Sequence, residues 1–270
     1  MRKFFVAAIA AAVAVAGFAV ISQAGTGEGN TSFDFKLKPN KVKKPAAIDT
    51  VVLPSKVDDQ GTADTGDDVW TPASQNKVHL PNGSAVDTSA APRCKLTPSE
   101  VGSGKQCPSK TRVGDGAATV VVGGTPIGSG GQRQGGSMLN ATIEAFNTKS
   151  SLLLIVQPCA PGTGPSSGQD CDPAGDPTVL EGTWSKVATK PTLTVPTPQS
   201  LLAVGIIVQR FALSTDKETK TVKQKGKEVL KSLVLTPEEC GGKWKTRDDA
   251  KYVDGTSQTI KDNQKCKKPA

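Results

Sequence analysis

The stretch Phe33-Asp34-Phe35-Lys36-Leu37 alternates apolar and charged side chains at every position. Successive side chains of a β-strand point to opposite faces, so strict alternation is typical of a strand with one face buried and the other in water. Similar short apolar runs, separated by turn residues, recur at 48–53, 77–80, 117–122, 139–146, 152–157, 179–186, 193–195, 201–209, 219–225, 228–235 and 252–260. Together they predict an all-β fold, an antiparallel β-sandwich of the immunoglobulin type or a related one.

The β-rich region is predicted to cover residues 33–270, either as one large domain or as two small ones divided near residues 187–191. One short helical turn is predicted at 97–100, because Thr97 suits the N-cap and Pro98 suits the first turn. Three stretches have too few apolar residues to compensate for the entropy lost on ordering. We therefore expect loops at 58–74, 123–137 and 160–177.

The N-terminus has the three parts of a secretory signal peptide. Met1-Arg2-Lys3 is basic, residues 4–21 are apolar, and Ser22-Gln23-Ala24 supplies small residues for cleavage. We expect cleavage after Ala24, with residues 25–32 as a short linker, a secreted or cell-surface product and no transmembrane segment once the leader is removed. The alternative is an uncleaved anchor, because the apolar run is just long enough to span a hydrocarbon core.

All six cysteines lie after this leader. The chain has no CxxC pair and a single histidine, which disfavours a structural zinc module and a redox motif. An even number of cysteines in an exported protein predicts disulfides. Sequence alone leaves about fifteen pairings open. We favour the sequential one, Cys94 with Cys107, Cys159 with Cys171 and Cys240 with Cys266, because each couple brackets a segment rich in glycine, proline or charge.

No catalytic, cofactor-binding or metal-ligating residue is predicted. His79 is the only imidazole, and it alternates with Val78 and Leu80, so we interpret it as a solvent-facing side chain on a strand. Adjacent carboxylates occur at 58–59, 67–68, 238–239 and 248–249, but spacing cannot place two of them across a sugar, as a glycosidase requires. The acidic stretch 58–68 does not match the ligand register of an EF-hand calcium loop.

The positive charge is unevenly distributed. The whole chain has a formal charge of +8, and residues 216–270 contain fourteen basic and nine acidic residues. A candidate patch for anionic surfaces lies on the predicted hairpin and consists of Lys220, Lys223, Lys225, Lys227 and Lys231. Edge-strand lysines that prevent sheets from associating are the alternative. Specific nucleic-acid binding is not expected, because the hairpin has no aromatic side chains for base stacking.

Several short motifs occur in a fixed order along the chain. They are Lys77-Val78-His79-Leu80-Pro81-Asn82-Gly83, Ala91-Pro92-Arg93-Cys94, Leu96, Cys107-Pro108-Ser109, Val113-Gly114-Asp115-Gly116-Ala117-Ala118, Ala145-Phe146-Asn147, Cys240, Trp244, Asp254-Gly255 and Cys266. This order resembles a family of secreted, uncharacterised actinobacterial proteins that read LPxG, a cysteine, CP and VGxGxA before an AFN-like strand. The resemblance covers residues 33–266. It implies export and a β-rich body braced by disulfides, and it supplies no catalytic residue. The loop at 160–177, which contains the second cysteine couple, departs from the family's pattern.

These observations predict a secreted, non-catalytic protein with a structural or binding role at the cell envelope or outside the cell. The expected partners are anionic cell-surface polymers or another envelope protein. The alternative is a secreted hydrolase, directed at glycans, that uses carboxylates the sequence does not identify. Two converging carboxylates or a cluster around His79 would favour this alternative.

Overall fold

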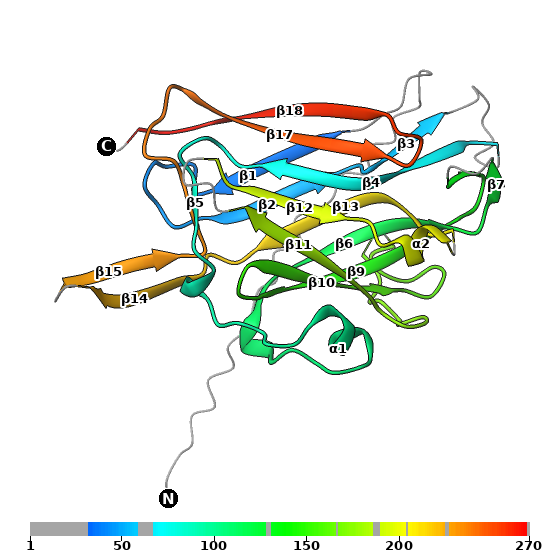
Figure 1. Ribbon diagram of the computed structural model, residues 1–270, viewed down its shortest axis with the longest axis horizontal. Helices are drawn as coiled ribbons and strands as arrows, with labels where there is room; N and C mark the ends of the chain where they lie inside the picture. The colour runs from blue at the N-terminus through cyan, green and yellow to red at the C-terminus, as the bar shows by residue number, and fades with distance from the viewer. Residues whose placement is uncertain are drawn as a thin grey trace, which may run out of the picture.

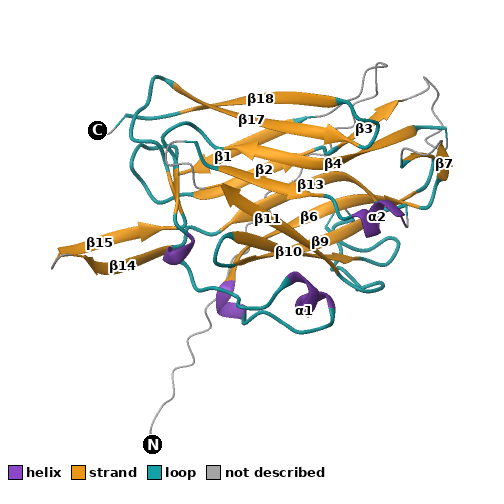
Figure 2. Ribbon diagram, viewed as in Figure 1, coloured by secondary structure: helices purple, strands orange, loops and turns teal. Residues whose placement is uncertain are grey.

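The computed structural model describes residues 32–58, 67–127, 131–165, 167–185, 190–203, 205–224 and 227–268 (Figure 1). Strands dominate these residues, and the helices are single short turns (Figure 2). The strands are β1 (Phe33–Lys38), β2 (Ala47–Val52), β3 (Ser55–Asp58), β4 (Val69–His79), β5 (Ala85–Val86), β6 (Arg112–Val122), β7 (Thr125–Ile127), β8 (Gln132–Gln134), β9 (Ser137–Asn147), β10 (Ser151–Pro158), β11 (Thr178–Ser185), β12 (Thr192–Pro196), β13 (Ile207–Thr215), β14 (Thr219–Gln224), β15 (Lys227–Ser232), β16 (Val234–Leu235), β17 (Lys243–Tyr252) and β18 (Ser257–Lys265). The helices are α1 (Pro98–Gly102) and α2 (Gln199–Ala203), with 3₁₀ turns η1 (Thr88–Ala90) and η2 (Ser109–Thr111).

Most strands belong to one antiparallel sheet with the order β1-β2-β13-β6-β9-β10-β11-β12-β4-β17-β18. The sheet curls, so that its two halves form facing layers around a shared core (Figure 1). The predicted all-β, antiparallel fold is confirmed, and the single curled sheet is compatible with the predicted sandwich. β11 and β12, which flank the suggested division near 187–191, pair within this sheet.

Alternation decides which side chains enter the core. In β1, Phe33, Phe35 and Leu37 are buried and the residues between them are exposed, as the opening stretch predicts. These three side chains pack in one cluster with buried residues from both layers, including Trp184 of β11 and Trp244 of β17. Burial of this apolar surface is the main stabilising contribution to the fold.

The curl brings the two ends of the sheet together at a seam between β1 and β18. The backbone N–H of Phe35 donates to Asp262 Oδ2 at 3.0 Å, and that of Leu37 donates to Gln264 Oε1 at 2.8 Å. Gln264 Nε2 donates in turn to the Leu37 carbonyl at 2.8 Å. Side chains of β18 therefore satisfy backbone groups of β1 at an edge that no other described strand pairs with.

The glycines of the Val113–Ala118 motif are required because β6 packs closely against the backbone of β13. A Cβ at Gly116 would lie 2.0 Å from the carbonyl oxygen of Ala212, and one at Gly114 would lie 2.4 Å from that of Ser214. Only glycine permits β6 to approach β13 this closely.

The sequential disulfide pairing is confirmed: Cys94 is bonded to Cys107, Cys159 to Cys171 and Cys240 to Cys266. The first bond packs with Phe146 and Leu153 in a small apolar cluster beside α1. Closing loops of this length contributes about 3 kcal/mol each in the chain-entropy model. The disulfides therefore brace segments that contain little apolar surface of their own.

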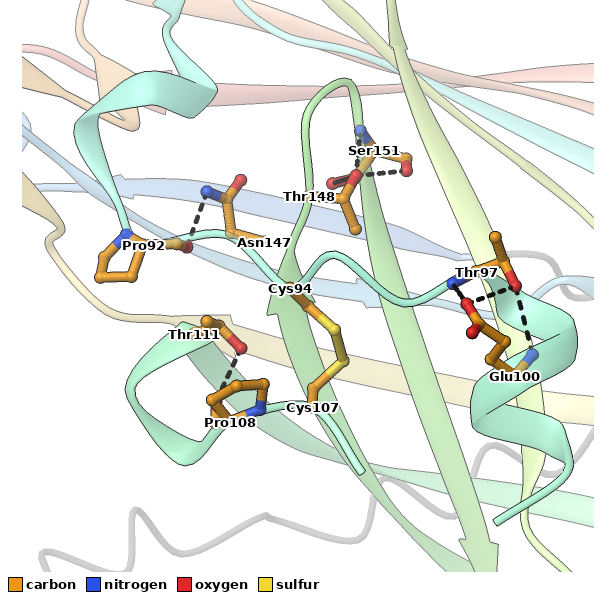
Figure 3. The surroundings of a disulfide bond; sticks show 10 residues. All are labelled: Pro92, Cys94, Thr97, Glu100, Cys107, Pro108, Thr111, Asn147, Thr148 and Ser151. Carbon is orange, nitrogen blue, oxygen red and sulfur yellow. Dashed lines mark hydrogen bonds between the residues drawn. A yellow bond between two sulfur atoms is a disulfide. The ribbon is translucent and has the colours of Figure 1, made fainter. Parts of the chain in front are cut away.

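Figure 3 shows how the chain around the first disulfide is held. Asn147 is fully buried, and its Nδ2 donates to the carbonyl oxygen of Thr88 at 2.9 Å. It also donates to the carbonyl oxygen of Pro92 at 3.1 Å (Figure 3). The Thr97 hydroxyl caps α1, and Glu100 Oε2 accepts from the Thr97 backbone N–H at 2.9 Å (Figure 3). The predicted helical turn is thus confirmed, with both halves of a capping box present.

Other sequence predictions need correction. The predicted strand at 201–209 is divided between α2 and β13, and the one at 252–260 is interrupted by a turn at 253–255. The predicted loop at 58–74 includes the first half of β4, and the loop at 123–137 contains β7 and β8. β17 was not expected, because its inward positions include Thr246 and Asp248 and so hide the alternation.

The predicted hairpin at 219–235 is present as β14 and β15, which form a separate two-stranded sheet that projects from the body (Figure 1). Its proposed turn at Gly226, the leader 1–24 and all but Ser32 of the linker lie outside the described residues. Within the described ranges, no helix is long and apolar enough to cross a membrane.

Candidate anion-binding site

The β17–β18 hairpin presents an unusually one-sided charge. Trp244, Thr246 and Asp248 of β17 point into the protein, so the residues between them point outward. The outward face of the hairpin, here called the cationic face, carries six basic side chains and one carboxylate. These are Lys243, Lys245, Arg247, Lys251, Lys261, Lys265 and Asp249.

The strand register places like charges directly opposite each other. Lys243 pairs with Lys265, and Arg247 pairs with Lys261. Opposed side chains in an antiparallel pair have Cβ atoms about 5 Å apart, and like charges there are destabilising. Arg247 has a carboxylate partner in Asp249, at 3.3 Å from its Nε. The lysines of the cationic face make no ion pair with any described residue, so their repulsion is not relieved within this part of the chain.

An open pocket of about 480 Å³ lies where this face meets the end of β4. Its described lining consists of His79, Leu80, Asn82, Lys190, Lys245, Thr246, Arg247, Lys261 and Asn263. Four of these side chains are lysine or arginine, and none is a carboxylate. The pocket is therefore suited to an anionic group.

A hydrogen-bond network fixes one wall of the pocket. Asp249 Oδ2 lies 2.6 Å from His79 Nε2, and its Oδ1 accepts from the Thr259 hydroxyl at 2.8 Å. Burial lowers the pKa of His79, and the positive charges of Arg247 and Lys77 add to this effect against the attraction of Asp249. His79 is thus the neutral donor to Asp249 at pH 7.

Asp249 is the anionic centre of that network. Burial opposes its ionisation, but the hydrogen bonds from Thr259 and His79 outweigh burial and lower its pKa. The carboxylate therefore stays ionised and binds both His79 and Arg247, which line the pocket.

Asp248, the neighbour of Asp249 in sequence, is buried in the protein interior. It is 0% exposed, and neither of its oxygens accepts a hydrogen bond of normal geometry within the described structure. Burial raises its pKa to about 7, repulsion from Asp249 adds to the increase, and the backbone of Lys77 only partly offsets it. Two adjacent carboxylates thus lie on opposite faces of β17.

The lysine patch predicted from sequence lies on the projecting β14–β15 hairpin. Its lysines are less concentrated than the basic side chains of the cationic face. Lys223 is opposite Glu228, and Lys231 Nζ lies 2.9 Å from Asp87 Oδ2. The register puts Lys220, Lys227 and Lys231 on one side of the hairpin and Lys223 on the other. Lys225 lies outside the described residues.

The remaining residues considered from the sequence are the aromatic side chains, the possible metal ligands and His79. Of the eight aromatic residues after the leader, seven are buried and Phe211 is partly buried, as strand packing predicts. No group of three or more His, Cys, Asp or Glu side chains in the described ranges is placed to hold a metal ion. His79 lies on the face opposite Val78, but its side chain is only 20% exposed, so the predicted solvent-facing position is wrong and its place in a pocket beside Asp249 was missed.

The cationic face itself was also missed. Alternating basic residues at 243, 245, 247 and 251 are the signal that reveals it once β17 is recognised as a strand. No protein-family model and no curated protein matches this chain.

Proposed function

We propose that this chain is an exported, non-catalytic binding protein that engages anionic polymers of the cell envelope through the cationic face. The observation that carries the proposal is the direct opposition of like charges, Lys243 with Lys265 and Arg247 with Lys261. Such pairs cost stability in the isolated protein, and a bound polyanion would remove that cost.

Export is supported by three disulfides, which persist in oxidising compartments, and by the signal-peptide pattern of residues 1–24. The resemblance to secreted actinobacterial proteins is in accord with it. Since seven of the eight aromatic side chains after the leader are buried and Phe211 is partly buried, none is a fully exposed platform for stacking on neutral sugars in the described structure. Recognition is therefore electrostatic.

The hydrolase alternative has one observation in its favour, the His79–Asp249 pair beside a pocket. Glycoside hydrolysis needs two carboxyl groups on either side of the scissile bond. Asp248 and Asp249 point to opposite faces of β17, and the described lining contains no carboxylate, serine or cysteine. The geometry therefore favours binding over catalysis.

Two variants of equal net charge test the proposal. One carries Lys245→Gln, Lys261→Gln and Lys265→Gln, and the other carries Lys220→Gln, Lys223→Gln and Lys227→Gln on the β14–β15 hairpin. We expect the first to elute from phosphocellulose at clearly lower salt than the wild type, and the second to elute close to the wild type. Equal shifts for both variants, or no retention of the wild type, would refute the role of the cationic face.

A further inference from the structure

The pocket differs from the rest of the cationic face in being concave and in bringing together different donor groups. Lys245, Arg247 and Lys261 come from the hairpin, and Lys190 comes from the segment that precedes β12. The side-chain amides of Asn82 and Asn263 add neutral donors. Basic and amide side chains thus line one pocket instead of being spread along a strand.

This set of donors exceeds what a carboxylate needs. A carboxylate carries one charge and two oxygens, whereas a phosphate monoester carries close to two charges at pH 7 and three acceptor oxygens. Arg247 lies directly opposite Lys261, so an anion between them would contact both. A dianionic tetrahedral group matches four cations and two amides better than a planar monoanion does.

The network behind the pocket also holds one donor in place before any ligand arrives. Asp249 Oδ2 lies 3.3 Å from the Nε of Arg247, and the same oxygen accepts from His79 Nε2 at 2.6 Å, which fixes the carboxylate. A guanidinium oriented in this way loses less side-chain entropy when it binds an oxyanion. The volume of about 480 Å³ lies within the usual range for small-molecule sites and accommodates a phosphate together with the group that it esterifies.

We propose that this pocket is a subsite for one phosphate monoester group, and that it selects phosphate-bearing polymers among the anionic polymers that the cationic face attracts. The inference rests on the proposed function and makes it more specific. The same group occurs at the end of a polymer and on small phosphorylated molecules, and the experiments below separate these sources.

His79 provides a direct readout, because it is the only histidine of the chain and gives one set of ring signals. We expect glycerol phosphate to shift the His79 ring resonances saturably and to raise the pKa of His79, since a bound anion offsets the charges of Arg247 and Lys77. Acetate and chloride at equal ionic strength are expected to produce no saturable shift. A shift that follows ionic strength alone would overturn the inference.

Matched variants locate the site. Lys261 lines the pocket, whereas Lys265 lies on the same face outside it. We expect Lys261→Gln to weaken glycerol phosphate binding about tenfold or more and Lys265→Gln to leave it within about twofold. Arg247→Lys keeps the charge but removes the planar fork, and it should weaken binding as well. Equal effects of Lys261→Gln and Lys265→Gln would show that there is no localised subsite.

Competition shows whether the pocket binds phosphate groups on polymers or only on small molecules. It also distinguishes failure of the phosphate subsite from failure of the proposed function. If a soluble cellulose oligomer that carries phosphate monoesters displaces glycerol phosphate from the pocket, as read from the His79 resonances, the pocket takes part in polymer binding. If both bind together, the pocket does not select polymers and the inference is wrong. Retention on phosphocellulose without any saturable effect at His79 would refute the subsite and leave the proposed function intact, whereas loss of retention would refute the proposed function itself.

Discussion

The two lysine-rich hairpins of this protein, β14–β15 and β17–β18, have similar composition and very different surfaces. The first projects from the body and exposes both faces; three of its described lysines lie on one side and one on the other, and two have acidic neighbours. The second is part of the main sheet and buries one face, so alternation directs every basic side chain of β17 to the other. The comparison shows that burial of one face is what concentrates charge on the opposite face.

The largest effect is expected from the buried face of β17. Asp248→Asn replaces a carboxyl with a neutral group of the same shape. Because the pKa of Asp248 is about 7 in the folded protein and near 3.8 in the unfolded chain, the wild type loses stability as pH rises from about 4 to about 7. Each pH unit in this range costs about 1.4 kcal/mol. The free energy of unfolding of Asp248→Asn should therefore be about 4 kcal/mol higher than that of the wild type at pH 8, and the two should be equal at about pH 3.5.

Denaturant unfolding across this pH range measures the difference, and Asp249→Asn is the matched control. The pKa of Asp249 is lowered in the folded protein, so its ionised form stabilises the fold above pH 4. The control should accordingly reduce stability at neutral pH. A difference between Asp248→Asn and wild type that does not change with pH would contradict the assigned environment.

The second effect concerns what holds the β17–β18 hairpin at its base. Cys240 and Cys266 close a loop with a sequence separation of 26 residues, and no disulfide joins β14 to β15. Replacing both cysteines with alanine should lower the free energy of unfolding by about 3.5 kcal/mol in the chain-entropy model. Urea unfolding under non-reducing conditions provides the measurement. A loss well below 1 kcal/mol would mean that strand pairing and the β1–β18 seam hold the hairpin without the disulfide.

The smallest effect is expected on the projecting hairpin. Lys231 and Asp87 form an ion pair in which each side chain is more than one third exposed. Exposed pairs of this kind contribute at most about 1 kcal/mol. Lys231→Met should therefore change the free energy of unfolding by less than that amount in the same urea assay. A loss above about 2 kcal/mol would show that the body depends on the β14–β15 hairpin far more than its exposure implies.

Local patterns were sufficient to predict much of the framework. Phe33–Lys38 alternates strictly and is a half-buried strand, and the three disulfides follow the sequential pairing. These features depend on residues that are close in sequence. The glycines of the Val113–Ala118 motif could not be explained from local sequence. Gly116 is required because of the Ala212 carbonyl, which lies on a strand nearly one hundred residues away.

The candidate site lay beyond prediction for a related reason. Asp248 is a charged residue at a core position, so β17 does not show the apolar alternation that identified other strands. Without β17 there is no register, and without the register Arg247 and Lys261 cannot be placed opposite each other. The pocket further requires Lys190, which the pairing of β12 with β4 and of β4 with β17 brings near the hairpin.

Lysine footprinting tests the central claim most directly. The protein is labelled with an amine-reactive reagent in the presence and absence of linear polyphosphate, and the modified residues are quantified by mass spectrometry. We expect Lys245 and Lys261 to lose most of their reactivity when polyphosphate is present, while Lys220 and Lys223 on the β14–β15 hairpin remain as reactive as before. Protection of Lys220 and Lys223 with Lys245 and Lys261 still reactive would contradict the account.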